Sequence, residues 1–105
     1  MSRDYRKLKV FTLADHLVLE TYRRAAFSVA ANIVEGSARY STREWLNFVS
    51  IAAGSATEAC YLAHVAGRLR FIETREATSL EGGYSELAAG LRAMSRALRE
   101  KPMNP

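Results

Sequence analysis

Apolar and polar residues follow the period of an α-helix along the whole chain. Apolar positions recur every three or four residues in three stretches, 13–34, 42–70 and 74–101, and no run alternates at every second position as a half-buried strand does. Proline, which breaks helices, is absent before Pro102. The pattern predicts an all-α protein with one helical-bundle domain over residues 1–105.

Local signals mark the ends of the expected helices. Gly36 is typical of a residue that terminates a helix, and Ser41 with Glu44 has the S-x-x-E form of a capping box. The Gly82–Gly83 pair predicts a kink or a frayed turn, because glycine costs about 1 kcal/mol in a helix. The predicted elements are an N-terminal arm (1–11), helix 1 (12–22), helix 2 (23–36), helix 3 (42–70) and helix 4 (74–101).

The first apolar stretch changes phase at the Tyr22–Arg23 junction. At about 100° per residue, Leu13 and Leu17 share one face of a helix. After the junction, Ser28 and Asn32 occupy that angle, so the apolar face has turned by roughly half a circle. One straight helix cannot bury both halves against one neighbour. Either it bridges two different partners, or a connector belongs at the junction.

Two segments carry a resemblance to a known family. The sequence AANIVEG at residues 30–36 and the sequence GSATEA at residues 54–59, with the similarity extending over residues 4–98, resemble the four-helix bundle proteins named after intervening sequences in 23S ribosomal RNA genes. The resemblance implies an antiparallel up-and-down four-helix bundle, a homo-oligomer with pentameric rings among the known members, and no established enzymatic activity. A related accessory protein of diversity-generating retroelements is a similar pentamer that works with a reverse transcriptase and nucleic acid.

This chain departs from the family where the apolar phase changes. Family members usually carry the end of one helix, a loop and the start of the next helix between the parts that match Tyr22 and Arg23, and the sequence here lacks that segment. With the connector, the fold would be a four-helix bundle. Without it, helices 1 and 2 fuse, and the bundle has to be completed by swapping between chains.

Charge adds a weak preference for anionic partners. The chain has 105 residues and a net charge of +4, and twelve of its fifteen cationic side chains are arginine, whose planar fork suits phosphate. The single cysteine excludes an intrachain disulfide and fits a reducing cytoplasm. The N-terminus has no apolar signal-peptide core, and no apolar run approaches a membrane span. A cytoplasmic protein without membrane contact is therefore predicted.

Arginine placement defines a candidate surface for RNA or DNA on helix 4 and at the corner before helix 3. The alternative is a solvated surface on which Arg96 pairs with Glu100 at i,i+4. No named nucleic-acid-binding motif is present. The candidate residues are Arg39, Arg43, Arg92, Arg96, Arg99 and Lys101.

Helix 3 is apolar around most of its circumference, which favours self-assembly. One narrow polar stripe includes Tyr61 and Arg68. The alternative is that the helix is buried within its own bundle. A stripe of small residues would let a second subunit approach closely, and its members, the expected oligomer interface, are Ala52, Ala56, Ala59, Ala63 and Ala66.

Polar residues near apolar faces predict a hydrogen-bonded brace, in which Glu58 meets Arg24 or Ser28 and Glu35 supports the corner. A shared internal site is the alternative interpretation. Buried carboxylates need such partners. The brace residues are Arg24, Asn32, Glu35 and Glu58.

Catalytic, cofactor and metal sites are not predicted. Glu58 and His64 are six residues apart and lack the Glu-x-x-His spacing of di-iron bundles. Cys60 lies in an apolar context, where cysteine acts as a small hydrophobe. We therefore expect a non-enzymatic, self-assembling protein that acts as a scaffold or accessory and contacts nucleic acid or a nucleic-acid enzyme. The alternative is a protein–protein interaction module without nucleic-acid binding, and no small-molecule substrate is indicated.

Overall fold

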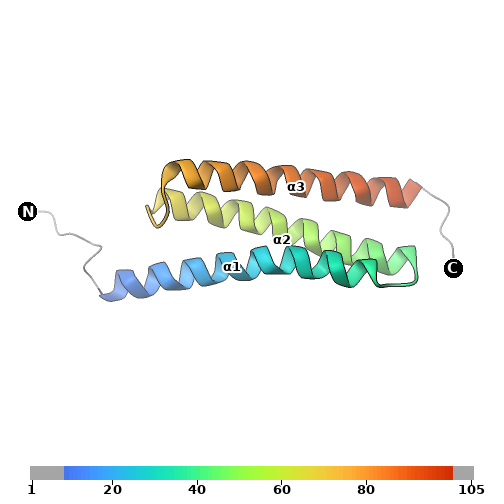
Figure 1. Ribbon diagram of the computed structural model, residues 1–105, viewed down its shortest axis with the longest axis horizontal. Helices are drawn as coiled ribbons and strands as arrows, with labels where there is room; N and C mark the ends of the chain where they lie inside the picture. Colours follow the sequence, from blue (N-terminus) through green and yellow to red (C-terminus); the bar gives the residue numbers. More distant parts are fainter. Residues whose placement is uncertain (1–8, 101–105) are drawn as a thin grey trace, which may run out of the picture.

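A computed structural model describes residues 9–100, which form three α-helices and no β-strand. The helices are α1 (Lys9–Ser37), α2 (Thr42–Arg68) and α3 (Thr74–Glu100). Successive helices are antiparallel, and α2 lies between α1 and α3 (Figure 1). The all-α prediction is confirmed.

The first two predicted helices are continuous in the structure. α1 passes through the Tyr22–Arg23 junction without interruption, because neither glycine nor proline is present there to break it. The four-helix prediction is therefore wrong for the single chain over residues 9–100, which has three helices. α1 also begins at Lys9, inside the predicted arm, and the remainder of that arm lies outside the described residues.

The corner between α1 and α2 depends on one glycine and one cap. The Ser41 hydroxyl accepts a hydrogen bond from the Glu44 backbone N–H at 3.1 Å, which confirms the predicted cap. A Cβ atom at Gly36 would lie 2.7 Å from Phe48 Cβ and 2.9 Å from Trp45 Cδ1. Glycine at this position therefore allows the end of α1 to approach the aromatic side chains of α2.

The turn between α2 and α3 is a Schellman motif. Phe71 N–H donates to the Ala66 carbonyl at 2.8 Å, and Arg70 N–H donates to the Gly67 carbonyl at 3.1 Å. Arg70 has φ 62°, a left-handed conformation that glycine usually adopts here. The following helix packs tightly, since a Cβ at Gly67 would lie 2.4 Å from Ala77 Cβ.

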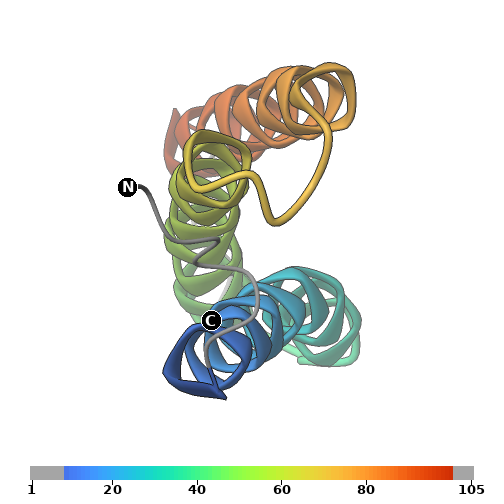
Figure 2. The same ribbon diagram turned by 90° about the vertical axis from the view of Figure 1, so that its left-hand side faces the viewer.

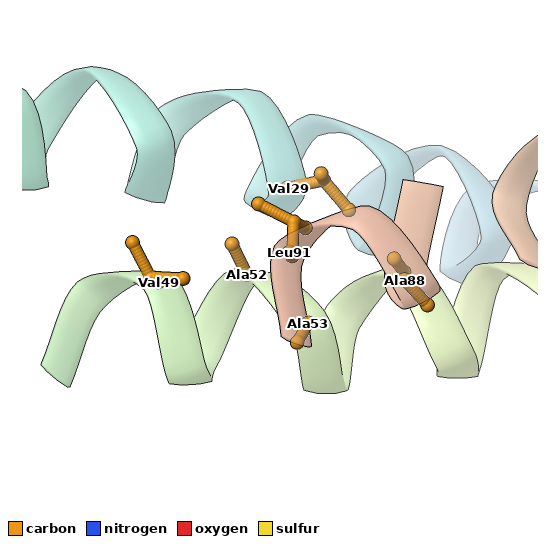
Figure 3. Close-up of a cluster of buried hydrophobic side chains, with 7 residues drawn as sticks. Val29, Val49, Ala52, Ala53, Ala88 and Leu91 are labelled. Atoms are coloured by element: carbon orange, nitrogen blue, oxygen red, sulfur yellow. The ribbon is translucent and has the colours of Figure 1, made fainter. Parts of the chain in front are cut away.

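Small side chains make up most of the core. Val49 is the largest side chain that is completely buried, and it belongs to a cluster with Val29 of α1 and Leu91 of α3 (Figure 3). Viewed end-on, the helices form an open arc with α2 between α1 and α3 (Figure 2). The radius of gyration is 17.5 Å, compared with about 13 Å for a compact domain of 100 residues. The chain is thus an elongated, open layer of helices.

The N-terminal half of α1 points its apolar face away from the other helices. Val10, Leu13 and Leu17 are 73%, 57% and 54% exposed. Asp15 faces the opposite way, and its Oδ1 atom is buried without a hydrogen-bond partner in the described part of the chain. Burying an unpaired carboxylate oxygen is costly, so the change of phase at the Tyr22–Arg23 junction leaves this half of α1 poorly matched to its own chain.

One aromatic contact joins the two outer helices. The rings of Tyr22 in α1 and Tyr84 in α3 meet edge-to-face, with centroids 6.0 Å apart and an interplanar angle of 89°. Burial raises the pKa of Tyr22 above its ordinary value, and a hydrogen bond to Tyr84 raises it further. This contact links the middle of α1 to α3 through two long side chains that meet over α2.

Candidate nucleic-acid interface

Three of the predicted arginines converge on one hollow between α2 and α3. Arg92, Arg96 and Arg99 follow helical spacing along one face of α3 and line a cavity of about 450 Å³. Ser50 and Gly54 of α2 line its other side. A Cβ at Gly54 would have no neighbouring atom within 4 Å, so the α2 backbone is accessible there. The cavity combines guanidinium groups, a hydroxyl and open backbone, which is a suitable environment for a phosphate group.

Two of these arginines have no side-chain partner within residues 9–100. Arg96 and Arg99 form no ion pair or side-chain hydrogen bond with any residue in the range 9–100. The Arg96–Glu100 pair considered from the sequence is not formed. Arg92 is held in place by donating from Nη2 to the Thr57 hydroxyl at 2.7 Å. One fixed and two free guanidinium groups therefore face the same hollow.

The hollow continues along α2. Thr57, Cys60, Tyr61 and His64 of α2 line a second cavity of about 460 Å³, which shares Arg92 with the first. Tyr61 is exposed to solvent at this cavity, with 65% of its surface accessible. On the α3 side, the small side chains of Ser85, Ala88 and Ala89 line the cavity between Glu81 and Arg92.

A third cavity extends the series toward the α2–α3 turn. It measures about 380 Å³, includes Arg68 and Arg70, and shares His64 and Glu81 with the second. We call the three adjoining cavities the α2–α3 groove. Among residues 9–100, five arginines line this groove, against a single carboxylate, that of Glu81.

Glu81 organises the centre of the groove. Its Oε1 atom lies 3.0 Å from Nδ1 of His64, and its backbone carbonyl accepts a weak hydrogen bond from the Cys60 thiol at 3.4 Å. No hydrogen bond joins Cys60 to His64 within residues 9–100. The arrangement therefore directs both side chains to Glu81 and does not form a nucleophile–base pair.

The corner arginines differ from those of the groove. Arg39 is ion-paired with Glu35 and its Cζ lies 4.9 Å from the centroid of the Phe48 ring, so it is engaged in local structure. Arg43 is exposed and lies on the same face of α2 as Ser50, seven residues before it. Lys101, the last predicted binding residue, lies outside the described residues.

Of the predicted brace residues, Asn32 takes part in a hydrogen-bonded network with Ser28 and Ser55. Asn32 Nδ2 donates to the Ser28 carbonyl at 2.8 Å and to its hydroxyl at 3.0 Å, and the Ser28 and Ser55 hydroxyls are 2.8 Å apart. The Glu58 brace is wrong, because Glu58 is exposed and has no side-chain partner among residues 9–100. Arg24 instead lies 3.9 Å from Glu20, an exposed pair that contributes little.

The alanine stripe of α2 is buried within the single chain. Ala52, Ala56, Ala59, Ala63 and Ala66 are each at most 2% exposed. α1 and α3 already cover them, so a second subunit cannot reach this stripe without displacing a helix. Within the single chain over residues 9–100, these alanines fit the alternative, a central helix buried within its own chain, and they are not exposed for the expected oligomer interface.

Sequence reasoning placed Tyr61 and Arg68 on a polar stripe but did not connect them with the arginines of α3. Arg70 and the His64–Glu81 contact were missed entirely. Helical spacing predicts which residues share one face of a helix. It does not predict the register between α2 and α3, on which the groove depends. No three His, Cys, Asp or Glu side chains in the described part of the chain are grouped to hold a metal ion. No helix within residues 9–100 has the length and apolar content needed to cross a bilayer.

The fold and the groove define a small all-helical protein with a basic surface groove. A family model described as 23S rRNA-intervening sequence protein matches residues 5–93. The chain therefore belongs to this family of small helical proteins, whose function is unknown and which is not a known enzyme family. Comparison with curated proteins gives no significant match.

Proposed function

We propose that this protein is a non-enzymatic, cytoplasmic scaffold or accessory that binds RNA or DNA, or an enzyme acting on them, through the α2–α3 groove. The observation that supports this most is the convergence of Arg92, Arg96 and Arg99 on one hollow that no carboxylate of residues 9–100 lines. Uncompensated arginines attract phosphates through charge and donate paired hydrogen bonds to them. Binding of this kind is largely independent of sequence and weakens as salt increases.

Removing the two free arginines tests the proposal. The double variant Arg96→Gln/Arg99→Gln should lower affinity for a labelled oligonucleotide about tenfold or more at low salt, and reduce the slope of log K against log salt by about 2. Fluorescence anisotropy at several salt concentrations measures both quantities.

A matched control removes the same charge elsewhere. Arg24 and Arg75 are exposed and line none of the three cavities of the groove. The variant Arg24→Gln/Arg75→Gln should therefore keep a slope close to that of the wild type. Equal losses of affinity in both double variants would mean that binding depends on the net charge of the protein and not on the groove. Absence of binding by the wild-type protein would overturn the proposal.

Self-assembly is the second part of the proposed function. The exposed face of Val10, Leu13 and Leu17 needs an apolar partner, and α1 cannot fold back to bury it within one chain. A second copy supplies that partner, so that residues 9–22 of one subunit complete a four-helix bundle in another. The family resemblance favours a closed ring, a pentamer, in which each groove is repeated and weak contacts gain avidity.

The alternative is an interaction module for other proteins. The observation that favours it is a second exposed apolar face on α1, where Phe27 and Val34 are 75% and 68% exposed. These two residues are seven apart and share one side of the helix. If the wild-type protein binds no oligonucleotide and Phe27→Glu abolishes capture of a single defined protein partner, this alternative replaces the nucleic-acid proposal.

A further inference from the structure

We infer that the α2–α3 groove takes single-stranded nucleic acid, with Tyr61 as a stacking platform for an unpaired base. The inference rests on the proposed nucleic-acid function and specifies its substrate class. It depends on the position of an exposed aromatic ring between two groups of arginines.

The order of side chains along the groove carries the argument. Tyr61 lines the central cavity, which shares Arg92 with the cavity of Arg96 and Arg99. On the other side, His64 joins the central cavity to that of Arg68 and Arg70. Basic groups at both ends with an aromatic ring between them match the alternation of phosphates and bases along a single strand.

The exposure of Tyr61 distinguishes a single strand from a duplex. Its side chain is 65% exposed and contacts no other aromatic ring within residues 9–100, so its faces are open to a planar ligand. In a duplex, each base already stacks on its neighbours and its faces are hidden. Only an unpaired base can lie on Tyr61, and stacking of this kind tolerates any base.

The dimensions of the groove fit a strand of several nucleotides. At a rise of 1.5 Å per residue, the part of α2 from Ser50 to Arg68 is about 27 Å long. Small residues, including Gly54, Ser85 and Ala89, keep the floor low. The Thr57 hydroxyl in the central cavity already donates to the Ala53 carbonyl and accepts from Arg92. The Ser85 hydroxyl, which lines the same cavity, can offer a hydrogen bond to a base without fixing its identity.

The test compares variants of Tyr61 on the full-length protein. The probes are labelled oligouridine and oligothymidine of twelve nucleotides and a labelled duplex of the same length. Fluorescence anisotropy measures the binding of each probe. Tyr61→Ala and Tyr61→Leu should each weaken single-strand binding about fivefold to a hundredfold, whereas Tyr61→Phe should stay within about twofold of the wild type. The salt slope should be the same in all of them, because no phosphate contact is removed.

A matched control and the duplex complete the design. Tyr40 at the α1–α2 corner is fully exposed and outside the groove, so Tyr40→Ala should bind as the wild type does. Circular dichroism should give the same helix content for every variant, because Tyr61 is a surface residue.

The outcomes separate the inference from the function on which it rests. A salt-dependent wild type that binds duplex as tightly as single strands, or a Tyr61→Ala variant that binds normally, would overturn stacking and leave phosphate binding by the arginines in place. A wild type that binds neither probe would overturn both. Selective single-strand binding that is lost in Tyr61→Ala and Tyr61→Leu but kept in Tyr61→Phe supports the inference.

Discussion

At the scale of single residues, Tyr22 is the ionisable group within residues 9–100 whose pKa clearly departs from its ordinary value. Burial is the main cause, and the hydrogen bond to Tyr84 acts in the same direction. The neutral phenol is therefore favoured in the folded protein. In the unfolded chain, a tyrosine ionises near pH 10.

The shift predicts a loss of stability at alkaline pH. Above about pH 10 the unfolded chain releases the Tyr22 proton while the folded protein keeps it, so the free energy of unfolding falls as pH rises. Below that pH the contribution of Tyr22 is fully present. The urea midpoint measured at pH 7 and pH 10.5 should fall less in Tyr22→Phe than in the wild type. The same change at exposed Tyr40 serves as control, and equal falls in Tyr22→Phe and the wild type would contradict the prediction.

At the scale of the helices, the glycines differ in what surrounds them. Gly67 brings α2 against Ala77 of α3, whereas Gly82 and Gly83 are exposed and a Cβ there would meet nothing within 4 Å. α3 is continuous through the glycine pair from Thr74 to Glu100. The pair therefore weakens α3 through propensity alone, while Gly67 sets the distance between two helices.

Alanine substitutions should consequently have opposite effects. Gly67→Ala forces α2 and α3 apart and should lower the free energy of unfolding by about 1–2 kcal/mol, after the gain in helix propensity is included. Gly82→Ala should raise it by about 0.5–1 kcal/mol. Urea denaturation followed by circular dichroism measures both. A stabilised Gly67→Ala variant would mean that the helices are not in close contact at Ala77.

At the scale of the whole molecule, we propose that the chain is one subunit of a larger assembly. Its core is filled mainly by alanine, and its dimensions are 66 × 21 × 14 Å. Exposed apolar side chains occur on both halves of α1, among them Leu13 and Phe27. A chain of this length has little core to lose, so we expect its stability to depend on subunit contacts and on protein concentration.

The apolar face of residues 9–22 is where assembly should be most sensitive. Sedimentation velocity should give a multi-subunit species for the wild type, and Leu13→Glu/Leu17→Glu should convert it to monomers, because unpaired carboxylates cannot be buried in an apolar interface. Ser79 and Ala93 are exposed on α3 and line none of the described cavities of the groove. Their double change to Glu should leave the assembly intact. A wild-type monomer at micromolar concentration would refute self-assembly.

Helical periodicity, capping and charge are local properties, and they were enough to predict the all-α class, the Ser41 cap and the arginine face of α3. The same periodicity exposed the change of phase at the Tyr22–Arg23 junction, although it left open whether one helix or two would form. The three-dimensional structure was needed to establish that α1 is continuous, that α2 buries its alanines between two helices of its own chain, and that Tyr61 lies in one groove with Arg92. Those outcomes depend on the register and distance between helices, which packing fixes and which no single helix encodes in its own spacing.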